Sequence, residues 1–415
     1  MARQWLFQVI ILIVMIFVFA LMACSSISEK NSNVGNKSGS ELNSLNMEAD
    51  SNFKEDNEME SNVNVNANMN VNVYEKAKMI GKAVNLGNAL EAPYEGAWDV
   101  VIEEEYFQLI KEKGFDSVRV PIRFSNKTTQ DSPYTVEDTF MKRVDWVVEQ
   151  SLNQGLNVII DLHHFDEMLS DPSANKDRFL SIWQQIASRY SSQPENVYYE
   201  ILNEPNGLIT AYLWNEYLLE AVEVIREYDP HRTLIIGGVD WNGIDGLYKL
   251  KLPEEDRNII ATFHYYGPML FTHQGAEWMT AEYGTTGLVW PGPPETAVEP
   301  NEAAKQIDWV RNFFNDYNTK TSSDNPASKE AIIRDLERAA EWGKTNDRPL
   351  FLGEFGAYRT ADLASRVAWT KTVRLEAERL GISWAYWEFG AGYGVYDRSA
   401  AKWKEELIEA LFSSQ

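Results

Sequence analysis

The chain has 415 residues, a formal net charge of −24 and a single cysteine. The acidic balance argues against nucleic acid and anionic lipid headgroups as partners, since both would be repelled, and one cysteine excludes a disulfide within the chain. With 44% hydrophobic residues and 14 tryptophans, the chain can fill a large core and still leave aromatic rings for a binding groove. This composition suits a soluble, secreted protein that acts on a neutral substrate.

Residues 1–23 have the pattern of a signal peptide. A short start with Arg3 is followed by an almost wholly apolar stretch from Trp5 to Ala23. The stretch runs into Leu-Met-Ala-Cys, which resembles the lipobox of bacterial lipoproteins, where the cysteine (here Cys24) is lipidated. We therefore expect an extracellular protein that is tethered to the bacterial cell membrane. Two alternatives stay open: free secretion after cleavage behind Ala23, and an uncleaved membrane anchor.

Residues 24–72 are rich in Ser, Asn and Glu and have almost no aromatic side chains. Such a segment cannot bury enough apolar surface to offset the entropy of ordering, so we predict a disordered tether. Residues 63–73 alternate apolar side chains with Asn, which is the period of a strand. An edge strand is therefore an alternative there, although the Asn-rich context favours a linker.

From residue 73 to 415, short apolar runs alternate with longer amphipathic ones. The predicted strands are Ala83–Leu86, Ser117–Pro121, Asn157–Leu162, Val197–Leu202, Thr233–Gly237, Ile259–Phe263, Pro349–Gly353 and Ile382–Trp387. Helical patterns lie between them, for example at Val136–Gln154, Ala211–Tyr228, Lys329–Thr345 and Ala361–Leu380. This alternation predicts one domain of the α/β class, a (β/α)8 TIM barrel. The crossover after Asp240 has only a weak helical pattern, and the insertion at 267–321 is expected on the active face.

Two of the predicted strands lead into a glutamate. The run VYYEILNEP ends in Asn203-Glu204-Pro205, and the run PLFLGEFG is centred on Glu354. The carboxyl ends of all strands of a barrel meet on one face, so these two carboxylates are expected to converge. Hydrolysis of a glycosidic bond needs such a pair, one as proton donor and the other as nucleophile or base.

The other strand ends add polar and aromatic side chains in a specific order. They are Asn88, Glu91, Arg119, His163, His164, His264, Tyr266 and Trp387. Five of them, together with Asn203 and the two glutamates, resemble the shared residues of glycoside hydrolase family 5, whose catalytic glutamates stand on strands 4 and 7; the five are Arg119, His163, His264, Tyr266 and Trp387. The resemblance runs from Tyr74 to the C-terminus. The runs NLGNALEAP, FTHQGAEW, GEFGAYR and AYWEFG resemble a bacterial subfamily of broad-specificity β-1,4-glucanases, whose members often accept mannans.

The resemblance implies a role for each of these residues. Glu204 would be the acid/base and Glu354 the nucleophile, in a mechanism that retains the anomeric configuration and places the carboxyl groups about 5 Å apart. Partial burial beside a second carboxylate is expected to raise the pKa of Glu204, while Arg119 and Tyr266 are expected to keep Glu354 ionised. The remaining roles are 2-hydroxyl binding by Asn203, positioning of the pair by His163 and His264, stacking under the sugar by Trp387, and sugar contacts by Asn88, Glu91, His164, His273 and Trp278.

We therefore expect a retaining endo-β-1,4-glucanase that cuts internal bonds of a β-linked polysaccharide and acts as a monomer. An endo-β-1,4-mannanase, an enzyme with both activities and an exo-acting glycosidase stay open. A non-catalytic polysaccharide-binding lipoprotein is disfavoured because both glutamates are present. No cofactor and no metal are expected, since the His163-His164 pair has no further carboxylate at ligand spacing. Glu388 is expected to point away from the site, because it follows Trp387 directly in a strand pattern.

Overall fold

The computed structural model describes residues 72–413. The predicted signal peptide, Cys24 and nearly all of the predicted tether lie outside the described residues, so lipidation and disorder there stay predictions. Val73, the last residue of the alternative edge strand, belongs to a helix. Among the described helices, none combines the length and the apolar character that a bilayer crossing requires.

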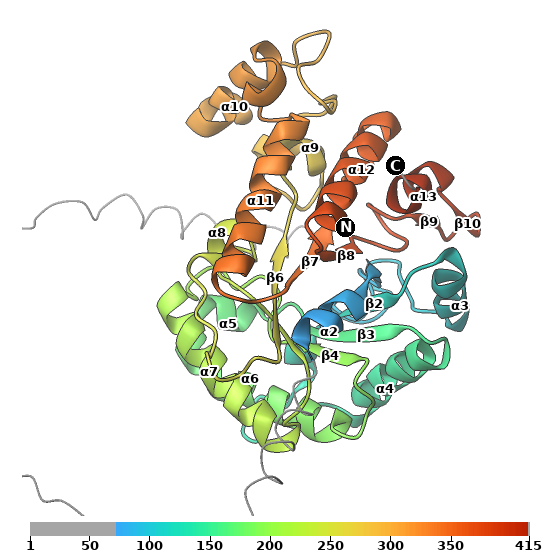
Figure 1. Ribbon diagram of the computed structural model, residues 1–415, viewed down its shortest axis with the longest axis vertical. Helices are drawn as coiled ribbons and strands as arrows, with labels where there is room; N and C mark the ends of the chain where they lie inside the picture. Colours follow the sequence, from blue (N-terminus) through green and yellow to red (C-terminus); the bar gives the residue numbers. More distant parts are fainter. Residues whose placement is uncertain (1–71, 414–415) are drawn as a thin grey trace, which may run out of the picture. The chain divides into compact units, whose positions relative to one another are not determined.

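The core of residues 72–413 is a closed barrel of parallel strands that pair in chain order, with β8 returning to β1 (Figure 1). The strands are β1 (Lys82–Asn85), β2 (Ser117–Ile122), β3 (Asn157–Leu162), β4 (Val197–Glu200), β5 (Leu234–Gly237), β6 (Ile259–His264), β7 (Leu350–Phe355) and β8 (Ser383–Tyr386). The predicted (β/α)8 barrel is confirmed, and each predicted strand overlaps an observed one with ends that differ by at most two residues.

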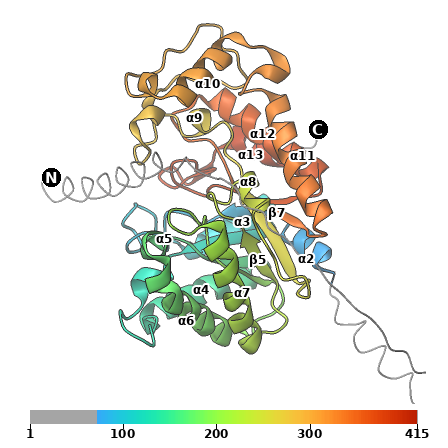
Figure 2. The same ribbon diagram turned by 90° about the vertical axis from the view of Figure 1, so that its left-hand side faces the viewer.

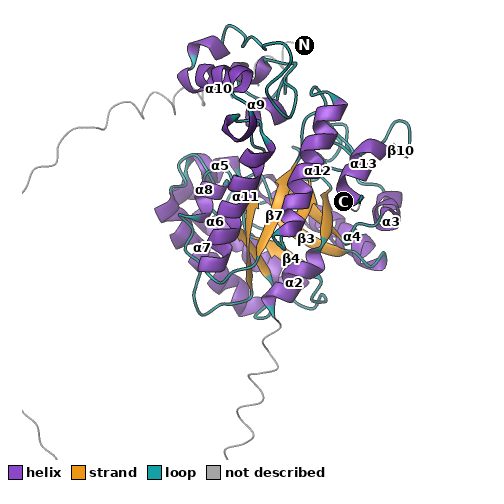
Figure 3. Ribbon diagram, turned by 45° about the horizontal axis from the view of Figure 1, so that its top comes forward, coloured by secondary structure: helices purple, strands orange, loops and turns teal. Residues whose placement is uncertain are grey.

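Amphipathic helices cover the outside of the barrel (Figure 3). The larger ones are α3 (Glu104–Lys113), α4 (Asp138–Asn153), α6 (Pro172–Tyr190), α7 (Ala211–Tyr228), α11 (Lys329–Thr345), α12 (Leu363–Arg379) and α13 (Glu405–Phe412). In α7, the buried side chains Trp214, Leu218, Ala221 and Ile225 recur with the helical period, which is why this segment packs on the sheet. The bounds of α7 and α11 match the prediction, and the weak fifth crossover contains only the short α8 (Ile244–Leu247).

One helix that the sequence analysis did not predict closes the bottom of the barrel. It is α2 (Val73–Ile80), and Asn72 caps its N-terminus by accepting a hydrogen bond from the Tyr74 N–H. Val73, Ala77 and Ile80 form a buried cluster with inward-facing side chains of seven strands, namely Ala83, Ile159, Tyr198, Ile235, Ile260, Phe351 and Ala385. Figure 2 shows α2 on one side of the barrel and, on the other, α5 (Asp166–Ser170) and α9 (Met269–Thr272), which follow β3 and β6. The carboxyl ends of the strands therefore form the face opposite α2.

Candidate active site

Glu354 lies in β7, and its carboxylate is held by two donors. The Arg119 guanidinium donates to Oε1 at 2.7 Å, and the Tyr266 hydroxyl donates to Oε2 at 2.9 Å. The side chain is only 6% exposed. Burial raises the pKa of Glu354, while His264, Arg119 and the hydrogen bond from Tyr266 act in the opposite direction. Both donors that the sequence analysis expected at this carboxylate are in place.

Arg119 is fully buried in β2 and binds more than one carboxylate. Its Nε and Nη2 atoms form a two-pronged contact with Glu200 at 2.7 and 2.8 Å, and Nη2 lies 3.0 Å from Asp161 Oδ2. With Glu354, three carboxylates thus share one guanidinium. Burial raises the pKa of Asp161 to about 7 even though Arg119 lowers it. Burial also raises the pKa of Glu200 and Arg119 lowers it, because one guanidinium only partly offsets the cost of burying several carboxylates.

Glu204 stands just beyond β4. The strand ends at Glu200, two residues before its predicted end, and Glu204 lies in the loop that follows it, as the sequence analysis expected. Its backbone has a φ of +48°, in the left-handed region that non-glycine residues seldom adopt. Oε1 lies 2.8 Å from His264 Nδ1, and the side chain is 29% exposed. Burial raises the pKa of Glu204 to about 7; Arg119 lowers it and Glu200 raises it. Glu204 in turn raises the pKa of Glu354, so the two carboxylates disfavour each other's charge as the predicted pairing implied, and Glu200 adds a further negative charge.

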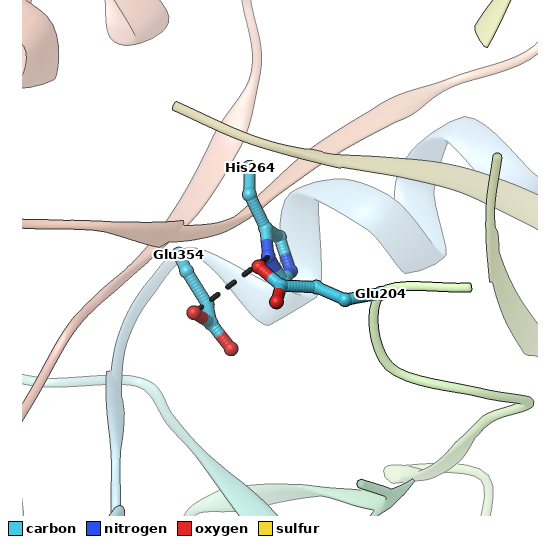
Figure 4. Close-up of side chains that lie close together, drawn as sticks. All are labelled: Glu204, His264 and Glu354. Carbon is cyan, nitrogen blue, oxygen red and sulfur yellow. Dashed lines mark hydrogen bonds and ion pairs between the residues drawn. The ribbon is translucent and has the colours of Figure 1, made fainter. Parts of the chain in front are cut away.

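Glu204, His264 and Glu354 converge on one point (Figure 4). One carboxylate oxygen of each glutamate and a ring nitrogen of the histidine lie within 4.8 Å of one another. This spacing matches the pair of carboxyl groups about 5 Å apart in retaining glycosidases and is too short for the intervening water of inverting ones. Burial lowers the pKa of His264 to about 4, so the imidazole between the carboxylates is neutral near pH 7.

The same three side chains are of the types that bind metal ions. Their surroundings disfavour this use, because both oxygens of Glu354 already accept hydrogen bonds and the Arg119 charge would repel a cation. The arrangement therefore suits proton transfer and nucleophilic attack better than metal binding.

His163 and Trp387, both predicted as site residues, lie side by side. Burial lowers the pKa of His163, whose Nδ1 is 2.5 Å from Asp161 Oδ2. Its ring is parallel to Trp387, with centroids 5.7 Å apart and planes 7° apart. A Cβ at Gly87 would lie 2.9 Å from the Trp387 ring, so glycine is required at that position for the indole to lie where it does.

The predicted sugar contacts fall on two sides of this centre. His164 adjoins His163, with ring centroids 4.6 Å apart, on the side of β3. His273, at the end of α9, packs against Tyr266, with ring centroids 4.9 Å apart. Trp278, which is 55% exposed, packs against the ring of Tyr358.

Glu91, which the sequence analysis predicts as a sugar contact, is buried in the turn after β1. It is 1% exposed, and its carboxylate accepts hydrogen bonds from the backbone N–H groups of Asn88 and Ala89. Asn88 has a φ of +66°, so this carboxylate holds a strained turn in place. The geometry supports a loop-forming role for Glu91, and its contact with a sugar stays a prediction.

Glu388 points away from the reacting pair, as predicted, but for another reason. The strand β8 ends at Tyr386, so strand alternation does not apply to Glu388. Its buried carboxylate instead accepts hydrogen bonds from the N–H groups of Gly390, Ala391 and Tyr393 at 2.7, 2.6 and 3.0 Å. It thereby shapes the loop that carries Tyr393, a neighbour of Tyr266, His273 and Trp278 that the sequence analysis missed.

Comparisons with known proteins agree with this geometry. The family model described as cellulase (glycosyl hydrolase family 5) matches residues 79–392. Endoglucanase H of Acetivibrio thermocellus is 32% identical over 82% of the chain, which spans 33% of that relative's own length. Cel5A of Thermotoga maritima, solved in complex with cellobiose, is 44% identical with a TM-score of 0.73, covering 82% of this chain and 100% of that one. The same protein, solved with mannotriose, matches at 43% identity with the same coverage and TM-score. Because the family model matches residues 79–392, which are most of the chain, the chain belongs to glycosyl hydrolase family 5, the cellulase family.

Proposed function

We propose that this protein is a retaining endo-β-1,4-glucanase in which Glu354 is the nucleophile and Glu204 the acid/base. The observation that carries the proposal is that an oxygen of Glu204 and an oxygen of Glu354 lie within 4.8 Å of each other, while the two carboxylates have different surroundings. Glu354 faces a fixed positive charge and a hydroxyl donor, whereas Glu204 contacts a neutral imidazole and has a pKa of about 7. One group is therefore suited to stay ionised and the other to hold a proton.

In the first step, Glu354 attacks the anomeric carbon while Glu204 gives its proton to the oxygen of the departing sugar. The glycosidic C–O bond breaks as the bond to Glu354 forms, which leaves a covalent glycosyl-enzyme. In the second step, the Glu204 carboxylate takes a proton from water, and the resulting hydroxide displaces Glu354 from the anomeric carbon. Two inversions at one carbon return the original configuration.

Neighbouring side chains support these steps. Asn203 Oδ1 accepts a hydrogen bond from Arg119 Nη2 at 2.8 Å, which leaves the amide NH₂ free to donate to the sugar 2-hydroxyl. Tyr266 keeps the attacking carboxylate in one rotamer, and Trp387 offers a flat apolar surface beside His163. Asn203 is buried, Tyr266 and Trp387 are half-buried, and the contacts of all three are formed in the absence of substrate.

A β-1,4-glucan is the proposed substrate because endoglucanase H is named for that activity and Thermotoga Cel5A was solved with cellobiose. Mannans are the second candidate, supported by the complex of that Cel5A with mannotriose. Glucan is favoured because endoglucanases H and C of Acetivibrio thermocellus are among the curated relatives.

The test is product analysis of the intact chain on carboxymethyl cellulose, mixed-linkage glucan, glucomannan and galactomannan, with the Glu354→Gln variant as control. We expect internal cleavage of the glucans, and proton NMR of the first products should show the β anomer. Initial α products, or equal activity of the control variant, would contradict the proposal. Faster cleavage of galactomannan than of any glucan would favour the mannanase alternative.

We further propose that the protein is extracellular and is held at the membrane by a lipid on Cys24. This proposal rests only on the residue pattern at 1–24, and that segment lies outside the described residues. The monomeric state also remains a proposal.

A further inference from the structure

Trp98 is a partly exposed aromatic side chain next to His164, one of the predicted sugar contacts. It lies in the loop between β1 and α3 and is 41% exposed. Its ring meets the ring of His164 edge to face, with centroids 6.0 Å apart and planes at 77°. His164 in turn adjoins His163, which lies parallel to Trp387. Neighbouring rings thus lead from Trp387, through His163 and His164, to Trp98.

The loop that carries Trp98 is held firmly in place. The Glu95 carboxylate accepts hydrogen bonds from Arg143 Nε and Nη2 at 2.9 and 2.8 Å and from the Ile102 N–H at 2.9 Å. Arg143 also donates to the Ile102 carbonyl at 2.6 Å. A partly buried ion pair with this many contacts fixes the loop, so the exposed indole is presented in one orientation.

The position of Trp98 also tells which part of a bound chain would reach it. In the closed ring of strands, β1 lies opposite β5. The loop after β5 contacts that of Glu204, since the Trp241 N–H donates to the Pro205 carbonyl at 3.4 Å. The proton donor must face the departing sugar, so that sugar extends toward β5. The β1 loop is therefore on the side of the sugars that stay attached to the nucleophile.

We propose that Trp98 forms an outer sugar-binding subsite on the non-reducing side of the cleavage point, where its ring stacks on a glucosyl unit beyond the one at Trp387. The inference rests on the proposed glucanase function. It predicts that Trp98 acts only on substrates long enough to reach it. Short oligosaccharides, which fill the positions nearest Glu204 and Glu354, gain nothing from it.

The experiment compares the intact chain with its Trp98→Ala and Trp98→Leu variants on cellotriose, cellopentaose and cellohexaose. Trp98→Leu keeps an apolar side chain on the loop and serves as the variant that preserves folding. Trp309→Ala is the matched control, because Trp309 is a 50% exposed tryptophan on α10 (Asp308–Thr319) whose ring packs on Tyr283. All variants are expected to unfold at the temperature of the parent chain.

Both Trp98 variants should lose about three- to tenfold in kcat/KM on the pentaose and hexaose, the size of one aromatic contact, and nothing on the triose. Trp98→Phe should recover most of the loss. With cellopentaose labelled at its reducing end, the labelled product should become longer, since the chain loses its hold on the non-reducing side.

Equal loss on all lengths, no loss on any, or a shorter labelled product would overturn the proposal while leaving the glucanase assignment intact. If the parent chain itself cleaves none of these oligosaccharides or the glucans, the proposed function fails and the subsite with it. The two failures are thus told apart by the parent chain alone.

Discussion

Arg119 binds the Glu354 carboxylate at 2.7 Å from a position that water cannot reach. The same guanidinium also contacts Glu200 and Asp161, so a single residue of β2 ties together β3, β4 and β7 beneath the cleft. The contact therefore serves both the charge of the nucleophile and the stability of the barrel. Its two roles can be separated by experiment.

Replacing Arg119 by methionine should lower both stability and turnover. The loss leaves buried carboxylates without a partner, which costs about 3–5 kcal/mol in the free energy of unfolding. Arg119→Lys restores a charge but not the planar fork that reaches Glu200 twice, so it should recover part of the stability and little of the activity. Urea unfolding and initial rates on a soluble glucan measure the two effects. A methionine variant as stable as the parent would contradict the assigned role.

The two glutamates should respond differently to the leaving group. Glu354→Gln should lose activity on every substrate, on the order of 10⁴-fold or more. Glu204→Gln should lose about 10²–10⁴-fold on glucan and far less, in formation of the glycosyl-enzyme, on a dinitrophenyl β-cellobioside, whose leaving group needs no proton. The measurement is the pre-steady-state burst of dinitrophenolate. The roles would be reversed if Glu354→Gln, and not Glu204→Gln, gave that burst.

Activity should fall on the alkaline side near pH 7. The first step requires a protonated Glu204, whose pKa is raised to about 7 by burial, so turnover declines as that proton is lost. Glu200→Gln removes a negative charge that raises this pKa and should move the alkaline limb to lower pH. The check is kcat/KM from pH 4 to 9 on a neutral glucan. An alkaline limb unchanged in the Glu200→Gln variant would show that Glu200 does not act on Glu204.

Stability should decrease over the same range for a separate reason. Burial raises the pKa of Glu91 from 4.5 to about 8. A carboxyl whose pKa is raised in the folded state favours folding below its unfolded pKa, and this contribution is lost as the pH rises through the folded value. The unfolding temperature should therefore drop between about pH 4.5 and 8, and Glu91→Gln should flatten that slope. Parallel pH profiles for the variant and the parent chain would contradict this.

Cys24→Ser tests the proposed lipid anchor. If a lipid on this cysteine holds the protein, the serine variant should move from the membrane fraction to the medium, with unchanged specific activity. Fractionation followed by immunoblotting measures this, and mass spectrometry of the mature N-terminus identifies the modification. Retention of the serine variant in the membrane fraction would favour an uncleaved apolar anchor.

The sequence was sufficient for the barrel because its strands are apolar runs with regular helical patterns between them. It was also sufficient for Glu204, Glu354, Arg119 and Tyr266, whose order along the chain carries the family resemblance. Asp161 and Glu200 were missed, although a charged residue inside a buried strand is itself a signal that it must be paired. Their partner could not be read from the sequence, because the contact depends on which strands become neighbours.

Other details could not be predicted because they depend on local backbone geometry. Nothing in Asn-Glu-Pro indicates the left-handed φ of Glu204, which sets how the acid is held in its loop. The hydrogen bonds from the Asn88 and Ala89 N–H groups to Glu91 depend on the turn that these residues form. The helix α2 falls inside the predicted domain but was not predicted as a helix, because it is short and borders the Asn-rich stretch.

That short helix sets a limit on where the chain can be cut. Val73, Ala77 and Ile80 are one wall of a core shared with seven strands. A cut ahead of Asn72 would leave this floor of the barrel intact. A cut one turn further along would remove Val73 and uncover part of the floor, which should lower the free energy of unfolding.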